Sequence, residues 1–414
     1  MATVPKPVLV LNSGSSSIKF SVYEAAGEQR QKLLEGELED IGAGTSGGAK
    51  FWIKSWLDGS GPDDSDRKKI VDETPDAPDL NAAFALISKA LTQSPFPRPV
   101  AIGHRMVCGG PTVTEDQRLT PELIAEMERY TSFAPLHAPS EIYIMRQTMQ
   151  LFPDVPNFVC LDSWFHRDLP EVTRYLPIPI EYREMGVRRF GAHGLSYESI
   201  VAHLRNEGQI PSRLIVAHLG NGASICAIRD GQSVDTAMGL TPTGGIISGS
   251  RPGDMDPGAL LFILRKIAEK PVKADDAAKE LESIVNKKSG LLGVSGLTSD
   301  MRTLRKAIAE GNSAARLAVD QFTYTIRKFI GSYIAVLGGL DMLVFTGGIG
   351  ENDAATREEV CARMDTLGIV IDAQRNRAPG EKRISADGSA VTVRVIPAAE
   401  DLTIVNHVCR LLGQ

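Results

Sequence analysis

The 414-residue sequence has little of what would assign it to a specialised protein class. Its five cysteines are odd in number and scattered without a CxxC pair, which argues against a disulfide framework or a zinc site and favours reduced thiols. A net charge of only −6 points neither to nucleic acid nor to an anionic membrane as a partner. No apolar run has the length of a membrane span, and "MATVPKPVLV" lacks the apolar stretch of a secretory signal. We therefore expect a globular protein of the cytoplasm.

What is present is an ordinary globular composition, with 43% hydrophobic and 23% charged residues. The chain is long for a single core, so two domains are expected. Residues 42–80 are crowded with Gly, Ser, Asp and Pro around "KFWIKSW". We expect this segment to be a peripheral elaboration of the first domain that contains one strand.

The stretch "VLVLNSGSSSIKFSVYE", residues 8–24, predicts a hairpin with an anion-binding turn. Residues 8–11 indicate a buried strand, and the alternation over residues 18–23 is typical of a half-exposed strand. The small residues between them form turns and direct backbone N–H groups and hydroxyls into one concavity, to which Lys19 could add a charge. A plain hairpin turn explains the same residues, so this motif alone does not establish a phosphate site.

Two further glycine clusters follow predicted strands. In "RLIVAHLGNGASICAIRDGQ" the pattern of strand, small-residue turn and strand is repeated, and Asp230 with Gly231 predicts another tight turn. In "DMLVFTGGIGEN" a glycine-rich turn leads from a strand into a helix, which directs helix N–H groups towards a ligand. Together the three clusters favour a duplicated fold that holds a nucleotide between two domains.

Ten motifs, in order along the chain, carry a resemblance to a known family. They are "LNSGSSSIKF", "GHRMVCGG", "APLHAP", "LDSWFH", "GAHGLSY", "HLGNGAS", "SGSRPGDMDP", "GLTSDMR", "FTGGIGEN" and "AAEDL". On these motifs the sequence resembles the acetate kinase family, within the sugar kinase, Hsp70 and actin superfamily, over nearly its whole length.

The resemblance implies an α/β fold with two domains of duplicated ββ-β-α-β-α-β-α type, as in actin-like ATPases and ribonuclease H, around an active-site cleft. Domain I would comprise residues 1–161 and 398–414, and the nucleotide-binding, dimerising domain II residues 162–397. The resemblance also implies a homodimer that uses ATP and Mg²⁺, with Mn²⁺ as an alternative, to phosphorylate a short carboxylate reversibly.

Three charged residues in these motifs suit phosphoryl transfer, which depends mostly on positioning and positive charge. Arg105 and Arg251 lie in glycine-rich loops, where their forked donors suit phosphate or carboxylate oxygens. The resemblance assigns Arg105 to the carboxylate and the transferring phosphoryl group, and Arg251 to the transition state. Asp162 is either a helix N-cap or a catalytic carboxylate, and we favour orientation over proton abstraction because acetate is already ionised.

Two histidines complete the expected catalytic set. His193 precedes a predicted helix for which Ser196 is the expected N-cap. By resemblance His193 donates a hydrogen bond to the equatorial phosphoryl oxygens, although a turn histidine packed on a strand explains the residue equally well. His137 in "APLHAP" is expected to support the phosphoryl path, and the alternative is a rigid linker.

The resemblance also assigns metal and nucleotide ligands. Asn12 and Glu400 would hold Mg²⁺ through hard oxygen atoms. As an alternative, Glu400 at a helix start could interact favourably with the helix dipole. The expected nucleotide contacts are Ser15, Ser17, Lys19, His218, Leu219, Gly220, Asn221, Gly222, Asp300, Met301, Arg302, Gly348, Ile349, Gly350 and Asn352.

The pocket for the acid is matched by Arg105, Val107, Leu136, Ala192 and Pro242. Ala192 departs from the family pattern, in which a bulkier residue precedes the histidine. Cys108 stands where His is usual and Trp164 where a small residue is usual. None of these departures removes a catalytic group, but each could tune the choice of acid, so we expect propionate to be accepted beside acetate.

Three functions remain open on the sequence. An acyl kinase agrees with every motif. A sugar kinase of the same fold would need a polar acceptor pocket and an Asp base, and a non-catalytic nucleotide switch of the Hsp70 type would not need both Arg105 and Arg251.

Overall fold

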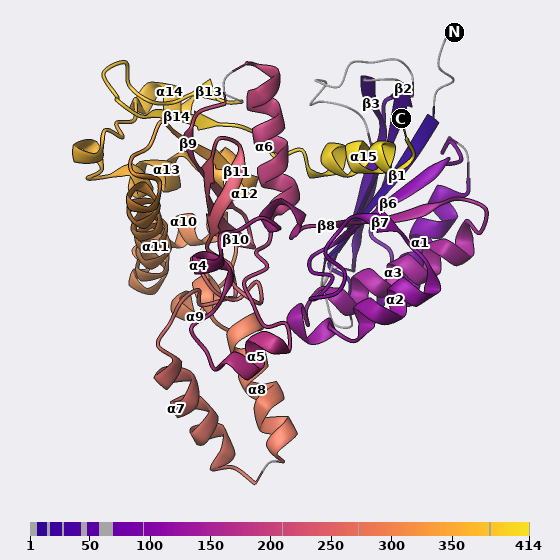
Figure 1. The fold of residues 1–414 in the computed structure, drawn as a ribbon, viewed down its shortest axis with the longest axis horizontal. Helices are drawn as coiled ribbons and strands as arrows, with labels where there is room; N and C mark the ends of the chain where they lie inside the picture. The colour runs from indigo at the N-terminus through magenta and orange to yellow at the C-terminus, as the bar shows by residue number, and fades with distance from the viewer. Residues whose placement is uncertain are drawn as a thin grey trace. The chain divides into compact units, whose positions relative to one another are not determined.

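The computed structural model describes residues 6–14, 17–26, 29–42, 48–57, 69–93, 95–208, 210–271, 273–380 and 382–413 (Figure 1). The chain divides into two compact units. Unit 1 combines Met1–Trp164 with Ala399–Gln414, so the C-terminal helix belongs with the N-terminal sheet. Unit 2 is Phe165–Ala398. None of the helices in the described ranges is both long enough and apolar enough to cross a membrane.

Unit 1 is built on one mixed sheet. Its described strands are β1 (Lys6–Ser13), β2 (Ile18–Ala26), β3 (Gln29–Glu39), β4 (Lys50–Ser55), β5 (Lys69–Glu73), β6 (Ala101–Met106), β7 (Gln117–Arg118) and β8 (Asn157–Leu161). Their order is β5-β4-β3-β2-β1-β6-β8-β7. The strands β1 to β5 pair antiparallel in sequence order, whereas β1, β6 and β8 run parallel. The carboxyl ends of these three parallel strands therefore lie at one edge of the sheet.

Helices cover both faces of this sheet. They are α1 (Leu80–Leu91), α2 (Pro121–Glu128), α3 (Ala138–Leu151) and α15 (Glu400–Leu411), with the short turn η1 (Thr131–Phe133). Ile102 of β6 belongs to the core that α1 and α3 complete with Phe84 and Ile144. The next residue, Gly103, faces α15, because a Cβ atom there would lie 2.5 Å from Ile404. Glycine at this position lets α15 pack closely on the strand.

Unit 2 contains the second sheet. Its described strands are β9 (Arg213–Leu219), β10 (Ala223–Arg229), β11 (Gln232–Thr236), β12 (Met342–Thr346), β13 (Lys382–Arg383) and β14 (Thr392–Val395). The order is β11-β10-β9-β12-β14-β13, with β9, β12 and β14 parallel. This sheet repeats the arrangement of an antiparallel hairpin joined to parallel strands.

Helices of unit 2 pack on both faces of its sheet, whereas the helices Pro257–Ala268 and Ala274–Lys287 pack on each other (Figure 1). Those described are α4 (Glu171–Arg174), α5 (Ile180–Glu184), α6 (Gly194–Asn206), α7 (Pro257–Ala268), α8 (Ala274–Lys287), α9 (Gly290–Ser295), α10 (Met301–Ala309), α11 (Ser313–Leu337), α12 (Gly347–Asn352), α13 (Ala354–Cys361) and α14 (Ala373–Arg377), with 3-10 turns η2 (Trp164–His166) and η3 (Asp365–Leu367). Alternate residues of β9 divide between the two cores: Ile215 packs with Phe322 of α11, and Val216 with Ile200 of α6.

The expected α/β class is confirmed, and so are both predicted hairpins. Asn12 pairs with Lys19 across β1 and β2, and β9 pairs antiparallel with β10. The predicted tight turn after β10 contains Asp230 and Gly231 at φ values of 51° and 81°. Strand β4 is the strand expected within "KFWIKSW", but residues 42–80 also contain a second strand, β5, which was not expected.

Further local expectations are wrong. Arg105 lies in strand β6 and not in a glycine-rich loop, because the strand continues to Met106, before the two glycines. Helix α6 begins at Gly194 with His193 as its N-cap residue, so Ser196 lies inside the first turn and is not the cap. The Ser196 hydroxyl instead forms a hydrogen bond with His218 Nδ1 over 2.8 Å. That long-range partner, which local sequence does not reveal, occupies the group that would have capped the helix.

Candidate active site

The polar cluster of unit 1 is centred on Arg105. Arg105 lies near the end of β6, and Asp162 directly follows the adjacent parallel strand β8, so both side chains lie at the carboxyl edge of the sheet. Arg105 Nη2 donates to Asp162 Oδ2 over 2.8 Å, and Asp162 is fully buried. Arg105 Nη1 donates to Asn12 Oδ1, at the end of β1, over 3.2 Å. Three neighbouring strands thus bring together three of the predicted residues.

The charges around Arg105 hold it in its ionised form. Burial lowers the pKa of Arg105, but the carboxyl groups of Asp162, Glu400 and Glu141 raise it well above the ordinary value. Only 12% of the Arg105 side chain is exposed, so the guanidinium is a permanent, nearly desolvated cation. Such a cation interacts more strongly with a phosphoryl or carboxylate oxygen than a hydrated one.

The predicted metal ligands are both part of this cluster. Glu400 is the first residue of α15, and burial raises the pKa of its carboxyl group to about 7 despite the nearby charge of Arg105. Asn12 offers an amide oxygen whose second lone pair remains after Arg105 is bound. The carboxyl group of Glu400 and the amide oxygen of Asn12 are both hard oxygen donors. A divalent cation bound between them would favour the ionised form of the buried carboxyl group. Asn12 and Glu400 therefore fit Mg²⁺.

Glu141 belongs to the same cluster, and the sequence analysis missed it. This residue of α3 is buried, and its Oε2 accepts the backbone N–H of Val107 over 3.1 Å. Burial raises the pKa of Glu141 to about 8, and the charge of Arg105 lowers it only in part. Nothing in its local sequence marks it, because it lies on a helix as an ordinary glutamate would. The bond positions Val107, one of the predicted residues of the acid pocket.

The remaining predicted residues of unit 1 lie around the β1–β2 turn and the start of α3. His137 is the N-cap residue of α3, and Ser140 of the same helix donates both to His137 O and to Gly14 O. The helix start is thereby tied to the hairpin turn. Leu136 is half-buried beside His137, and Ser17 is also half-buried. Ser15 lies outside the described residues.

Lys19 differs from its expected environment. Its Nζ lies 3.3 Å from Glu37 Oε1 on the neighbouring strand, and 56% of its side chain is exposed. In this conformation the positive charge of Lys19 is balanced by Glu37, the residue that pairs with it on β3. Its expected contact with nucleotide phosphates stays a prediction.

The polar cluster of unit 2 is centred on His193. Its backbone has a left-handed conformation with φ of 57°, which is unusual for histidine and places the ring at the start of α6. His193 Nδ1 is hydrogen-bonded to Ser224 Oγ over 2.7 Å, and Ser224 Oγ also contacts the hydroxyl group of Tyr197. This chain of three side chains, of which Ser224 and Tyr197 are buried, fixes the orientation of the imidazole.

The ring of His193 also stacks on that of His218, with centroids 4.2 Å apart and an interplanar angle of 23°. His218 is the residue before Leu219, the last residue of β9, and its Nδ1 is hydrogen-bonded to Ser196 Oγ. A Cβ atom at Gly220 would lie 3.8 Å from His218 Nε2. The small-residue turn predicted to bind phosphate therefore lies directly against the two histidines.

Arg251 reaches the same turn from another loop. A Cβ atom at Gly222 would lie 3.3 Å from His193 Nε2 and 3.8 Å from Arg251 Nη1. Arg251 Nη1 donates to the carbonyl oxygen of Pro242, a predicted residue of the acid pocket, over 3.2 Å. The loop is anchored because Gly249 N donates to Asn221 O over 2.9 Å. Glycine at position 222 thus leaves room beside an imidazole and a guanidinium that converge there.

The predicted adenosine residues lie at the starts of two helices. Asp300 caps α10 by accepting from Thr303 N, and it also pairs with the exposed Arg302, while Met301 is buried. In α12, Asn352 Nδ2 donates to Gly348 O over 2.9 Å. Gly350 is buried, Ile349 is half-buried, and a Cβ atom at Gly348 would meet nothing within 4 Å.

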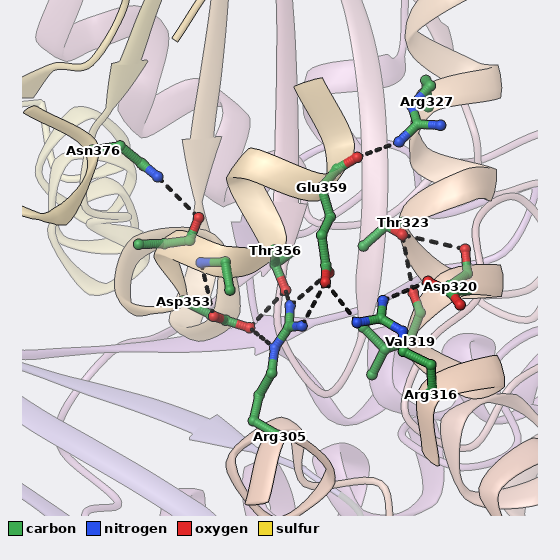
Figure 2. A network of polar contacts seen from close by, with 12 residues as sticks. Arg305, Arg316, Val319, Asp320, Thr323, Arg327, Asp353, Thr356, Glu359 and Asn376 are labelled. Atoms are coloured by element: carbon green, nitrogen blue, oxygen red, sulfur yellow. Dashed lines mark hydrogen bonds and ion pairs between the residues drawn. The ribbon is translucent and has the colours of Figure 1, made fainter. Parts of the chain in front are cut away.

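A half-buried arginine connects α10 with the end of α12 and the start of α13 (Figure 2). Arg305 of α10 donates from Nε to Asp353 Oδ2 over 3.0 Å, and Asp353 is both the N-cap of α13 and the residue that follows α12. Arg305 also donates to Thr356 and forms a two-point contact with Glu359, which in turn accepts from Arg316 of α11. This network fixes the position of α10 relative to α12 and α13, and its members were not among the predicted residues.

Ala192 is buried next to His193, and its carbonyl oxygen accepts a hydrogen bond from His166 Nε2 over 3.2 Å. His166 Nδ1 is hydrogen-bonded to Ser233 Oγ. His166 therefore holds the backbone that precedes His193, a role that the sequence analysis did not identify.

Comparison with known proteins places these clusters in a family. The model of the Acetokinase family matches residues 7–406. The acetate kinase of Phocaeicola vulgatus is 38% identical over 98% of this chain and 100% of its own length. The acetate kinase of Clostridium botulinum strain Hall is 38% identical over 96% of this chain and 97% of its own length. Among solved structures, that of Porphyromonas gingivalis acetate kinase is similar, with a TM-score of 0.82 and 35% sequence identity. That of a propionate kinase from Francisella tularensis has a TM-score of 0.85 and 33% sequence identity. Each similarity covers 98% of this chain and 100% of the other chain. The chain therefore belongs to the acetokinase family.

Proposed function

We propose that the protein transfers the γ-phosphoryl group of ATP to the carboxylate of acetate, giving acetyl phosphate and ADP, and that propionate is also an acceptor. A carboxylate oxygen forms the new bond to phosphorus as the bond between phosphorus and the β,γ-bridging oxygen of ATP breaks. The acceptor is already ionised at neutral pH, so no general base is required. The observation that carries this proposal is the buried Arg105, held by Asp162 and Asn12 at the edge of its sheet.

Within unit 1, Arg105 is proposed to bind the acceptor carboxylate and the transferring phosphoryl oxygens. Asp162 acts as a positioning residue, since it already accepts from Arg105 and lies fully buried. His137 supports this group from the start of α3, and Val107 and Leu136 border the methyl group of the acid. Asn12 and Glu400 would hold Mg²⁺, which would supply positive charge against the nucleotide phosphates.

Within unit 2, His193 and Arg251 are proposed to stabilise the charge that spreads over the phosphoryl oxygens. If Tyr197 donates to Ser224 and Ser224 donates to Nδ1 of His193, the proton of His193 is on Nε2, the atom next to Gly222. An Nε2–H group beside the guanidinium of Arg251 provides two kinds of preorganised donor for a phosphoryl oxygen. The close approach of both side chains to the turn supports this assignment.

The nucleotide is proposed to bind through the two glycine-rich turns of unit 2. His218, Leu219 and the turn Gly220, Asn221 and Gly222 would contact the phosphates. Ser15, Ser17 and Lys19 stay predicted nucleotide contacts. Adenosine would lie against Asp300, Met301 and Arg302 and against Gly348, Ile349, Gly350 and Asn352.

We further propose that the enzyme is a homodimer in the cytoplasm. Leu261 and Phe262 of α7 are 54% and 60% exposed, and exposed large apolar side chains on one helix support a protein interface. The five free cysteines are all buried and unbridged, which agrees with a reducing compartment. Light scattering of the purified protein should give twice the mass of the chain.

The test of the activity uses hydroxylamine, which converts acyl phosphates to hydroxamates. Purified protein with ATP, Mg²⁺ and acetate or propionate should form hydroxamate, and omission of the nucleotide or the metal should abolish it. If no acid of two to four carbons gives a signal while the protein is folded and binds ATP, the proposed activity is wrong. Phosphorylation of a sugar in the same assay would favour the alternative acceptor class.

A further inference from the structure

A second polar cluster of unit 1 lies outside the residues assigned to catalysis. Asp116 precedes β7, Cys160 belongs to β8 and His407 to α15, so three separate elements contribute one side chain each. All three residues are buried, and their possible ligand atoms lie within 4.8 Å of one another. The group comprises a carboxylate oxygen, a thiol sulfur and an imidazole nitrogen.

The contacts within this cluster are close and directional. His407 Nδ1 lies 2.6 Å from Asp116 Oδ2, and the other carboxylate oxygen of Asp116 accepts the backbone N–H of Leu161 over 2.8 Å. Arg410, one helical turn after His407, reaches Asp116 Oδ2 over 3.3 Å. Burial raises the pKa of the Cys160 thiol to about 11, and a hydrogen bond with His407 lowers it only in part.

We propose that Asp116, Cys160 and His407 form a binding site for a thiophilic divalent cation such as Zn²⁺. Sulfur, imidazole nitrogen and carboxylate oxygen are the three donor types that Zn²⁺ accepts, at bond lengths of roughly 2.0–2.3 Å. The donor atoms already lie within 4.8 Å of one another, so only small movements are needed around the ion. His407 Nδ1 and Asp116 Oδ2, now 2.6 Å apart, must separate to about 3.3 Å, the spacing of two ligands on a tetrahedral ion. The fourth position would be taken by a water molecule or another small donor.

The exchange of the cation for protons balances the charge. Binding releases the thiol proton of Cys160 and any proton shared by His407 and Asp116, which leaves one thiolate, one carboxylate and a neutral imidazole around a charge of +2. The site is then neutral, as a buried site should be. Arg410 is no longer needed beside Asp116, and its side chain, 54% exposed, can turn to solvent. Because protons are released, the affinity should rise with pH.

The alternative is a purely structural ion pair between His407 and Asp116, with Cys160 as a small buried neighbour. The two interpretations differ in a measurable way, because only a metal site forms a bond to sulfur. The site would also cross-link β8, which leads into Asp162, to α15, which begins at Glu400. Occupancy should therefore raise the melting temperature of the protein.

The experiment titrates Co²⁺ into protein freed of metal by chelation, with Mg²⁺ in excess to occupy the oxygen ligands. A Co²⁺–thiolate bond gives a charge-transfer absorption in the near ultraviolet, which oxygen ligands do not produce. We expect saturation at one ion per chain, displacement of the band by Zn²⁺ and a higher melting temperature with Zn²⁺. Absence of the band from the wild-type protein would overturn the proposal without any variant.

Three variants locate the bond. Cys160→Ser should abolish the band, whereas Cys409→Ser, at a buried cysteine of α15 outside the cluster, should retain it. Arg410→Gln removes the cation that competes for Asp116 from a half-exposed position, and should tighten binding by about two- to fivefold, the range of a partly exposed ion pair. A band that persists in Cys160→Ser, or that disappears in Cys409→Ser alone, would refute the assignment.

Discussion

Arg105 Nη2 donates a hydrogen bond to Asp162 Oδ2 over 2.8 Å, at the ends of two adjacent parallel strands. Because Asp162 is fully buried, its carboxylate depends on this guanidinium for compensation of its charge, and the guanidinium is held in one orientation. Such a preformed donor does not have to reorganise when negative charge develops on a phosphoryl group.

We expect Arg105→Ala to lower kcat by about 10² or more, as the removal of a transition-state donor does. The matched control is Arg146→Ala, which removes an arginine from an exposed pair with Glu128 and should leave kcat unchanged. Steady-state kinetics with acetate and ATP measure both. A folded Arg105→Ala protein with nearly full kcat would show that Arg105 has no catalytic role.

Arg251 is the corresponding cation of unit 2. We expect Arg251→Ala also to lower kcat by about 10² or more, because it removes a donor next to His193 and Gly222. Retention of kcat in a folded variant would assign Arg251 a structural role, such as its hydrogen bond to Pro242 O.

The hydrogen bond between Ser224 and His193 should determine which nitrogen of the imidazole carries the proton. We expect Ser224→Ala to lower kcat by roughly tenfold, which corresponds to the loss of one hydrogen bond of about 1.4 kcal/mol, with little change in KM for ATP. Ser389→Ala is the control, because it removes a hydroxyl group that donates to backbone carbonyl groups outside both polar clusters. Equal losses in the two variants would contradict the proposed function of Ser224.

Arg305 should affect nucleotide binding without touching the nucleotide. We expect Arg305→Met to raise KM for ATP roughly tenfold, because a small displacement of α10 relative to α12 misplaces the adenosine contacts (Figure 2). KM for acetate should stay the same. Arg375→Met, which breaks an exposed pair with Asp387, is the control. A change in KM for acetate and ATP alike would indicate general unfolding of unit 2 instead.

Glu141 predicts a pH dependence of stability. Burial raises the pKa of Glu141 from 4.5 to about 8, so between these values the folded protein keeps a proton that the unfolded chain releases. The free energy of unfolding must then fall as the pH rises through this window. Glu141→Gln retains an acceptor for Val107 N–H, and its free energy of unfolding should fall less steeply with pH than that of the wild type. Part of the slope should remain, because burial also raises the pKa of Glu400, to about 7. Urea unfolding at several pH values measures the free energy of unfolding, and Glu128→Gln, at an exposed glutamate, is the control. Equal slopes of this free energy against pH for the wild type and Glu141→Gln would contradict the prediction.

The choice of acid tests the role of Ala192. If its small side chain leaves space in the acid pocket, propionate should be used at least as well as acetate, because a buried CH₂ group contributes up to ~0.8 kcal/mol, roughly fourfold in kcat/KM. Ala192→Phe should restore a preference for acetate. The values of kcat/KM for acetate, propionate and butyrate decide the point, and a wild-type preference for acetate above tenfold that the variant leaves unchanged would rule out this role.

Local sequence determined the parts of this protein that depend on neighbouring residues. Apolar runs separated by small residues predicted both hairpins, and the turn of Asp230 and Gly231 followed from the left-handed conformation that these residues tolerate. The ordered motifs predicted the family and the α/β class, which the family match and the similar solved structures confirm.

Only the tertiary structure decided which distant residues share an environment. Glu141 is an ordinary helical glutamate until the fold buries it beside Arg105, and Ser196 fails as an N-cap because β9 brings His218 to its hydroxyl group. The scattered cysteines argued against a zinc site, because no CxxC pair is present, yet β8 and α15 bring Cys160 and His407 together with Asp116. Burial, pKa and hydrogen-bond partners depend on contacts between segments far apart in the chain, which the spacing of residues does not record.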